Sequence, residues 1–186
     1  MGRSGTSSLS RALKTLEINI GDNFIPPVKG VNPKGFWEDQ DIYDLNNKIL
    51  NFLKMNWSSL SPINQNQINL LKKKHFFTAA VKLLNSKLKN TNTFGFKEPR
   101  VTKLLPFWKL VFKKINIEVN YLIALRNPLS VAESLFIRDQ YDRIFSSFVW
   151  LDFTTSALYY TNNERRIIIN YDDLITKPND TLIRLS

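Results

Sequence analysis

Residues 119–125 constrain the fold of this chain more than any other segment, because they read as a buried strand that passes directly into a helix. The segment is apolar apart from Asn120, and its length suits a strand. Arg126 stands at its carboxyl end, Asn127 is a favourable N-cap, and Pro128 is a favourable first residue of a helix. In open α/β sheets, ligands collect outside the carboxyl ends of the strands. The junction therefore predicts an α/β unit with Arg126 close to a ligand.

Helical and strand patterns alternate along the rest of the chain. The expected helices cover residues 6–17, 39–54, 65–88, a stripe from 104 to 115, the segment after Asn127, residues 145–160 and a last helix that opens at Pro178. The helix over 65–88 is expected to carry its apolar stripe at Leu70, Phe77, Val81, Leu84 and Leu88. A loop rich in Gly and Pro covers 18–34, and further strands are expected at 94–97 and 166–170. This alternation predicts one α/β domain over residues 1–186, with three layers and a mostly parallel central sheet.

The charge of the chain and its few reactive side chains limit its chemistry. A net charge of +10 favours polyanionic partners such as phosphorylated nucleotides, nucleic acid or acidic surfaces. The chain has no Cys and one His, His75, which excludes a thiol nucleophile and disfavours a His-based metal centre or a Ser-His-Asp triad. No signature of a nucleic-acid-binding motif accompanies the Lys runs at 72–74 and 113–114, so we expect solvated helix faces there. There is no signal segment and no apolar run of the roughly 20 residues that span a bilayer, so we expect a cytoplasmic location.

An anion cradle is predicted at residues 3–8, directly before the first helix. Gly5 allows the backbone to turn so that successive N–H groups point at one ligand, and the helix start adds its positive dipole end. Arg3 supplies a forked cation, and Thr6, Ser7 and Ser8 supply hydroxyl donors. The segment lacks the Lys and the glycine spacing of a Walker A loop, which disfavours a kinase or an ATPase. The alternative interpretation is a turn that caps an ordinary helix.

A second anion site is predicted where the strand over 119–125 ends. Ser130, Ser134 and Arg138 recur every four residues on the following helix and therefore share one face. Together with Arg126 they can converge on one phosphate. Two anion sites in one chain indicate a ligand with two separated anionic groups.

These segments resemble the sulfotransferases that use 3′-phosphoadenosine 5′-phosphosulfate as the sulfuryl donor. Residues 3–7, Arg-Ser-Gly-Thr-Ser, are similar to the family's loop for the 5′-phosphosulfate. Arg126 and Ser134 are similar to its 3′-phosphate pair, and Arg138 matches a donor-binding position of some members. Residues 96–100 resemble the Lys-Asp/Glu-Pro segment of bacterial and protein-tyrosine sulfotransferases. Residues 169–174 resemble a late segment whose Tyr, here Tyr171, lies near the nucleotide.

The resemblance implies a P-loop-like sulfotransferase fold, related to bacterial, protein-tyrosine and carbohydrate sulfotransferases. It also implies a hydroxyl acceptor, with carbohydrate as one candidate. The donor site that it implies consists of Arg3, Ser4, Gly5, Thr6, Ser7, Ser8, Arg126, Ser134, Arg138 and Tyr171.

Sulfuryl transfer requires little covalent chemistry from the protein itself. Like phosphoryl transfer, it needs in-line positioning and stabilisation of charge on the leaving oxygen. Arg3 and Lys97 are the expected catalytic cations, and no metal is required. Glu38 is the expected base, in apolar surroundings formed by Phe36 and Trp37. In the alternative interpretation, Glu38 caps the helix over 39–54 and Lys97 is a surface lysine paired with Glu98.

The ends of the sequence and the composition leave further readings open. A doubly wound domain has an apolar strand before its first phosphate loop, and only Met1 precedes Gly2 here. Many family members also continue beyond the position of Ser186. We therefore expect a sulfotransferase domain without its first strand and its C-terminal segment. Two alternatives are a nucleotide-binding relative without turnover, and a basic protein that binds nucleic acid or acidic surfaces.

Overall fold

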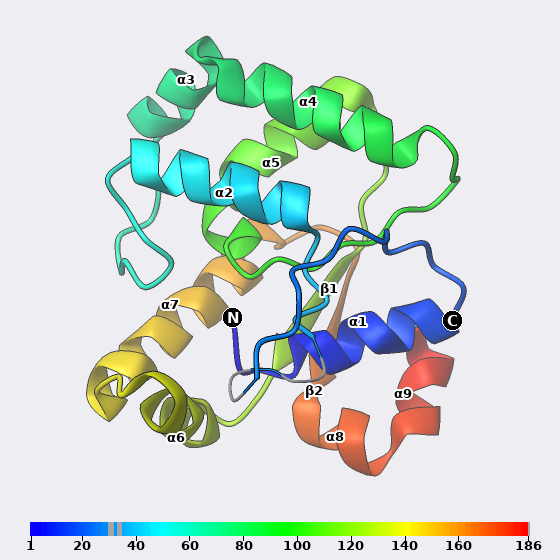
Figure 1. The fold of residues 1–186 in the computed structure, drawn as a ribbon, viewed down its shortest axis with the longest axis vertical. Coiled ribbons are helices and arrows are strands. Elements are labelled where there is room, and N and C mark those ends of the chain that lie inside the picture. The colour runs from blue at the N-terminus through cyan, green and yellow to red at the C-terminus, as the bar shows by residue number, and fades with distance from the viewer. Residues whose placement is uncertain (30–31, 33–34, 186) are drawn as a thin grey trace.

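The computed structural model describes residues 1–29, 32 and 35–185. Parts of the loop expected over 18–34, and Ser186, lie outside the described residues. The elements follow the order α1 (Thr6–Thr15), α2 (Gln40–Phe52), α3 (Gln65–Lys73), α4 (His75–Leu88), α5 (Val101–Ile115), β1 (Tyr121–Leu125), α6 (Pro128–Asp139), α7 (Arg143–Tyr160), β2 (Arg166–Asn170), α8 (Tyr171–Thr176) and α9 (Pro178–Leu185). In Figure 1 the two strands lie in the middle, with α2 to α5 above them and α1, α8 and α9 below.

Two parallel strands form the sheet in the described part of the chain. β1 pairs with β2 in a register that runs from Tyr121 opposite Arg166 to Leu125 opposite Asn170, and α6 and α7 make the crossover between them. The strands predicted over 119–125 and 166–170 are thus confirmed, as is a mixed α/β chain with parallel pairing.

The prediction of a strand over 94–97 is wrong. Among the described residues, this segment pairs at one position, where Phe94 forms a parallel bridge with Asn19 and the Gly95 N–H donates to the Asn19 carbonyl at 2.8 Å. A strand requires a neighbour that takes its N–H and C=O groups along its whole length. Asn19 supplies that neighbour for one residue, so the apolar run Phe94–Gly95–Phe96 does not become a strand.

Helices pack against both faces of the sheet. Leu122, Ala124, Ile167 and Ile169 share one face because side chains alternate along a strand, and they pack in one cluster with residues of α1, α8 and α9: Leu9, Ala12, Leu174 and Leu185. Tyr121 is directed to the other face and packs against the main core.

The main core lies between α2, α4 and α5. Phe107 and Trp108 of α5 are fully buried there, together with Ile42 and Ile49 of α2. The stripe predicted from residue 104 to 115 is confirmed, since Leu104, Trp108 and Val111 are all buried completely.

The prediction of one long helix over 65–88 is wrong, because this segment forms two helices that meet at Lys74. Lys74 has extended dihedral angles, φ −95° and ψ 169°, between α3 and α4. The predicted stripe is confirmed at Leu84, which is buried, and Phe77 and Val81 pack against the core, but it is wrong at Leu70, which is 40% exposed. Leu71, Phe76 and Ala80 are buried as well. Five positions separate Leu71 from Phe76, which an unbroken helix cannot keep on one face. The break at Lys74 turns both apolar stripes toward the core.

Candidate functional site

The turn at Arg3–Gly5 sets the direction of the first helix. Arg3 and Gly5 both have left-handed φ values, 66° and 80°, and Gly5 is the N-cap of α1 without a side-chain hydrogen bond at the cap. The first helical bond runs from the Leu9 N–H to the Gly5 carbonyl at 3.1 Å, so the amides of residues 6–8 precede the hydrogen-bonded ladder. A Cβ on Gly5 would lie 2.0 Å from Tyr171 Cδ2. Glycine is therefore required here both by φ and by the ring of Tyr171.

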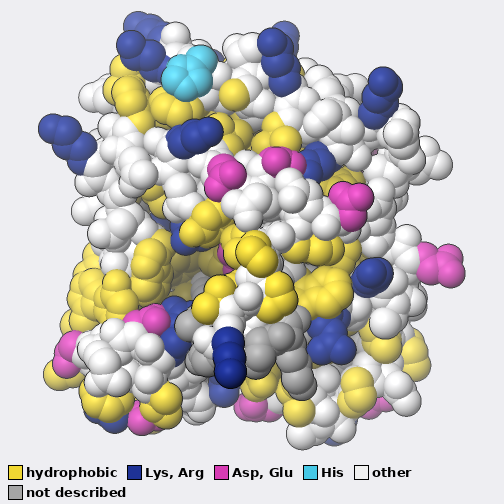
Figure 2. Space-filling view, viewed as in Figure 1, with side chains coloured by type: hydrophobic (Ala, Val, Ile, Leu, Met, Phe, Trp, Pro, Cys, Tyr) yellow, Lys and Arg dark blue, Asp and Glu magenta, His cyan; other side chains and the backbone are white. Residues whose placement is uncertain are grey.

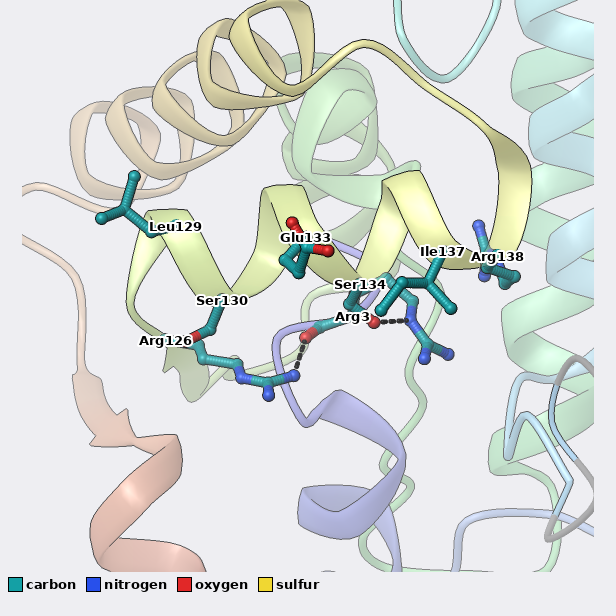
Figure 3. Close-up of a pocket in the computed structure, with 8 residues that line it drawn as sticks. All are labelled: Arg3, Arg126, Leu129, Ser130, Glu133, Ser134, Ile137 and Arg138. Carbon is teal, nitrogen blue, oxygen red and sulfur yellow. Dashed lines mark hydrogen bonds between the residues drawn. The ribbon is translucent and has the colours of Figure 1, made fainter.

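Three arginines surround a pocket of about 770 Å³, which we call the arginine pocket (Figure 3). Its walls are Arg3, Arg126, Leu129, Ser130, Glu133, Ser134, Ile137 and Arg138. Arg3 Nε donates to Ser134 Oγ at 2.8 Å, and Arg126 Nη1 donates to the Arg3 carbonyl at 2.9 Å. Ser130, Ser134 and Arg138 come from one face of α6, as predicted from their spacing. The pocket thus joins the first loop to the end of β1 and to α6.

The electrostatics of the arginine pocket favour an anion. The pKa of Arg3 is lowered by burial first, and then by the charges of Arg138 and Arg126. Arg138 has a partner outside the pocket in Asp139, to which its Nε donates at 2.7 Å. Glu133, the one carboxylate among the described residues of the pocket wall, accepts hydrogen bonds from Arg143 at 2.6 and 3.1 Å. A phosphate in this pocket would offset the repulsion among the guanidinium groups.

Arg126 is held by neighbours from two other elements. Its carbonyl accepts a hydrogen bond from Trp150 Nε1 of α7 at 3.0 Å, and its guanidinium lies 4.4 Å from the ring centre of Tyr171 in α8. Tyr171 therefore contacts both Arg126 and Gly5, the cation and the turn of the predicted donor site. The arrangement restricts the rotamers of Arg126 before any ligand binds.

A second polar group, the Lys97–Glu38 pair, lies at the first turn of α1. Lys97 Nζ donates to Glu38 Oε1 at 2.7 Å, to the Phe36 carbonyl at 2.6 Å and to Ser7 Oγ at 3.4 Å. Ser7 Oγ in turn donates to the Phe36 carbonyl at 2.8 Å. Both side chains are largely buried. Burial lowers the pKa of Lys97, and this effect exceeds that of the Glu38 charge, which raises the pKa.

A buried network lies behind this pair. Glu98, 4% exposed, accepts hydrogen bonds from Arg100 at 2.5 Å and from Asn46 Nδ2 at 2.6 Å, and Asn46 Oδ1 accepts one from Trp108 Nε1 at 2.9 Å. Arg100 also lies 4.0 Å from Glu38 Oε2. Burial raises the pKa of Glu98. The network connects the Lys97–Glu38 pair to the core of α2 and α5.

The structure divides the predicted residues into two groups. Arg3, Arg126, Ser134 and Arg138 lie at the arginine pocket, whereas Ser7, Glu38 and Lys97 lie together at the start of α1. The side chain of Arg3, predicted to serve with Lys97 as a catalytic cation, contacts Ser134. Glu38, expected among apolar rings, lies in an ion pair.

Three further hydroxyls of the predicted cradle have different surroundings. Ser4 is 2% exposed and thus faces inward, while Thr6 and Ser8 are partly exposed on the first turn of α1. The Thr6 carbonyl accepts a hydrogen bond from Ser10 Oγ at 3.1 Å. Backbone amides of residues 6–8 are therefore better placed for a ligand than the side chain of Ser4.

Sequence reasoning missed the roles of Asn46 and Glu98. Asn46 is completely buried on the apolar face of α2, beside Ile42 and Ile49. A polar residue within an apolar helical stripe is the signal that could have found it, because a buried amide requires hydrogen-bond partners. The sequence suggests Glu98 only as a partner of Lys97, and its burial has no signal in the local sequence.

Neither a metal-binding group nor a membrane-spanning helix is found among the described residues. Residues 1–29, 32 and 35–185 contain no group of three or more His, Asp or Glu side chains that could hold a metal ion. Within the same residues, no helix has the length and apolar character needed to cross a bilayer.

The cationic side chains do not form one surface on the face drawn in Figure 2. Blue Lys and Arg side chains stand apart there, with yellow and white side chains between them. A nucleic-acid site needs a basic patch or stripe on one face. This face of the molecule therefore gives no support to the nucleic-acid alternative.

The chain matches no protein-family model, no curated protein and no solved structure.

Proposed function

We propose that this chain is a sulfotransferase that moves a sulfuryl group from 3′-phosphoadenosine 5′-phosphosulfate to a hydroxyl acceptor. The observation that carries the proposal is the meeting of Arg3, Arg126 and Arg138 with Ser134 around one pocket. These residues come from two segments more than a hundred positions apart, Arg3 and Ser134 being separated by 131 positions. Guanidinium and hydroxyl donors that converge in this way suit a phosphate group.

The two polar groups suit the two anionic ends of such a donor. In this proposal the 3′-phosphate binds in the arginine pocket, and the 5′-phosphosulfate lies over the amides at the start of α1. The sulfuryl group then lies near Ser7 and Lys97, and the adenosine lies near Tyr171 and Gly5. Helices on both faces of a parallel sheet support the three-layer, P-loop-like fold that this donor site implies.

The Lys97–Glu38 pair has the groups that the reaction needs. The acceptor oxygen forms a bond to sulfur while the bond between sulfur and the bridging phosphate oxygen breaks. The acceptor proton passes to the Glu38 carboxylate, and 3′,5′-adenosine bisphosphate leaves with the negative charge. Lys97 Nζ and the amides of residues 6–8 stabilise that charge.

A transfer assay with labelled donor tests the proposed function. The chain is incubated with donor labelled in the sulfuryl group and with a carbohydrate, a phenol and a Tyr-containing peptide as acceptors. We expect label to pass to one acceptor class, and Glu38→Gln to lower that turnover by about 10²–10⁴-fold while leaving donor affinity nearly unchanged. Glu118→Gln, at a carboxylate whose side chain is 86% exposed, is the matched control. Equal turnover in Glu38→Gln and Glu118→Gln would remove Glu38 from the mechanism.

A further inference from the structure

The charges of this chain are distributed unevenly along its length. Residues 45–97 contain nine Lys, no Arg and no Asp or Glu, whereas the other residues carry positive and negative charges in nearly equal numbers. This segment therefore supplies almost all of the net charge of +10. It forms most of α2, the whole of α3 and α4, and the connections between them.

Seven of these nine lysines are exposed, and no described carboxylate forms an ion pair with them. Lys87 pairs with Asp39 and Asp41, and Lys97 pairs with Glu38. Within residues 1–29, 32 and 35–185 the ion pairs leave out the other seven, which are Lys48, Lys54, Lys72, Lys73, Lys74, Lys82 and Lys89. Positive charges without counterions on one part of a surface attract an anionic partner.

Most of these seven lysines lie where the end of α2 meets the start of α4. The centre of the Phe52 ring, in the last turn of α2, lies 5.1 Å from that of the Phe76 ring in the first turn of α4. Lys48 lies one turn before Phe52, and residues 72–74 lie directly before α4. In Figures 1 and 2 these helices are at the top of the molecule, and separate blue side chains with yellow ones between them cover them in Figure 2. We call this surface the lysine end, and it consists of Lys48, Phe52, Lys54, Leu70, residues 72–75 and Lys82.

The first turn of α4 adds backbone donors to the lysine end. The N-cap of α4 is Lys74, and among the described residues no side chain forms a hydrogen bond at this cap. The first turn also contains no acidic residue. The first amides of a helix have no partner within the helix and carry its positive dipole end. These amides and the ammonium groups of residues 72–74 therefore attract the same kind of anion.

Two apolar side chains favour an anionic lipid surface over other polyanions. Phe52 and Leu70 are each 40% exposed within the lysine end. Apolar side chains that enter the headgroup region strengthen the binding of a basic helix to a bilayer. The cations of the segment are all Lys, whose apolar stems extend along such a surface while the charges stay in water. Residues 45–97 contain no Arg, the side chain whose fork pairs with two oxygens of one phosphate.

We propose that the lysine end binds the surface of a bilayer that contains anionic lipids. In this contact the ammonium groups and the first turn of α4 meet the charged headgroups, and Phe52 and Leu70 lie between the headgroups. The arginine pocket and the Lys97–Glu38 pair contain no residue of the lysine end. The contact is therefore a second binding surface, and it does not depend on the proposed function.

Flotation with lipid vesicles tests this contact without any nucleotide. The chain should bind vesicles of phosphatidylcholine with about 30% phosphatidylserine and should not bind vesicles of phosphatidylcholine alone. Binding should fall as the salt concentration is raised from about 0.05 to 0.5 M, because salt screens exposed charges. Replacing Lys72, Lys73 and Lys74 by Gln should weaken binding by about 100-fold, since each lysine near an anionic surface contributes about fivefold.

Three control variants separate the lysine end from net charge. Replacing Arg11, Lys14 and Lys177 by Gln removes the same charge at exposed positions on α1 and between α8 and α9, on the other side of the strands in Figure 1. This variant should weaken binding by less than about threefold. Arg at positions 72–74 keeps the charges and should keep the binding. Leu70→Gln also keeps every charge, but it should weaken vesicle binding by about threefold and leave binding to a uridine homopolymer RNA unchanged.

Four results would overturn the proposal. The first is no binding to the phosphatidylserine vesicles at about 0.05 M salt. The second is equal binding to vesicles with and without phosphatidylserine. The third is equal weakening by the two triple Gln variants, which would assign the effect to net charge. The fourth is tighter binding to the RNA than to the vesicles, with no effect of Leu70→Gln on either, which would assign the lysine end to nucleic acid.

Discussion

Arg126 connects three parts of the site, because its guanidinium contacts the Arg3 carbonyl and the Tyr171 ring while its carbonyl accepts from Trp150. We expect Arg126→Ala to weaken the binding of 3′,5′-adenosine bisphosphate by about tenfold or more, since a charge-assisted contact contributes on the order of 1.5–3 kcal/mol. Isothermal calorimetry measures this directly.

The control for Arg126→Ala is Arg165→Ala. Arg165 has a side chain 77% exposed and an ion pair with Glu118, away from the arginine pocket. Arg165→Ala removes the same charge from the molecule as Arg126→Ala does. A loss of affinity that came only from the lower net charge would therefore appear in both variants. If both variants bind the bisphosphate as the parent chain does, Arg126 does not hold a phosphate.

Glu98 gives the stability of the chain a predictable pH dependence. Burial raises its folded-state pKa above 4.5, so the folded chain holds this proton more tightly than the unfolded chain. Its contribution to stability is therefore complete below pH 4.5 and is lost as the pH rises through the folded-state pKa. We expect the parent chain to lose stability relative to Glu98→Gln as the pH is raised from about 4 to 7, measured by urea unfolding.

The exposed carboxylate of Glu118 serves as the reference in that series. Glu118→Gln removes a carboxylate whose side chain is 86% exposed, and it should change the stability of the chain by less than about 0.5 kcal/mol. A parent chain that instead gains stability over Glu98→Gln as the pH rises would mean that the Arg100 ion pair outweighs burial at Glu98.

At the scale of elements, the start of α1 depends on one glycine. Gly5→Ala would place a Cβ against the Tyr171 ring at a φ of 80°, so either the turn or the ring must move. We expect a loss of stability of about 1–3 kcal/mol and weaker nucleotide binding, because the amides of residues 6–8 change direction. Gly2→Ala is the matched control, since nothing lies within 4 Å of its Cβ position, and it should change stability by less than about 0.5 kcal/mol. Equal losses in the two variants, in thermal unfolding, would contradict this account of the turn.

Elements with strong local signals could be predicted from the sequence. The helix after Asn127 begins at Pro128, with Asn127 Oδ1 accepting from the Leu129 and Ser130 amides, and α2 begins after its N-cap Asp39. The apolar runs 121–125 and 166–170 are strands because each supplies the other with a partner. The run at 94–97 has an equally good local pattern but pairs at Phe94 alone, and no local pattern reveals the absence of a partner.

At the scale of the whole molecule, residue spacing predicts which side chains share a helix face better than it predicts which distant segments meet. Spacing on α6 placed Ser130, Ser134 and Arg138 on one face, and the structure joins them to Arg126. The direction of the Arg3 side chain depends on its left-handed φ and on Ser134, which lies 131 positions away. Buried hydrogen bonds such as that between Asn46 and Glu98 depend on the same long-range packing, which residue spacing does not encode.

In the proposed function the arginine pocket holds the 3′-phosphate of a nucleotide. Calorimetry of the chain with 3′,5′-adenosine bisphosphate and with adenosine 5′-monophosphate tests it most directly, because the two ligands differ only in that phosphate. We expect the bisphosphate to bind at least about tenfold more tightly than the monophosphate, and this difference to shrink in Arg126→Ala. Equal affinities for the two nucleotides in the parent chain would contradict it.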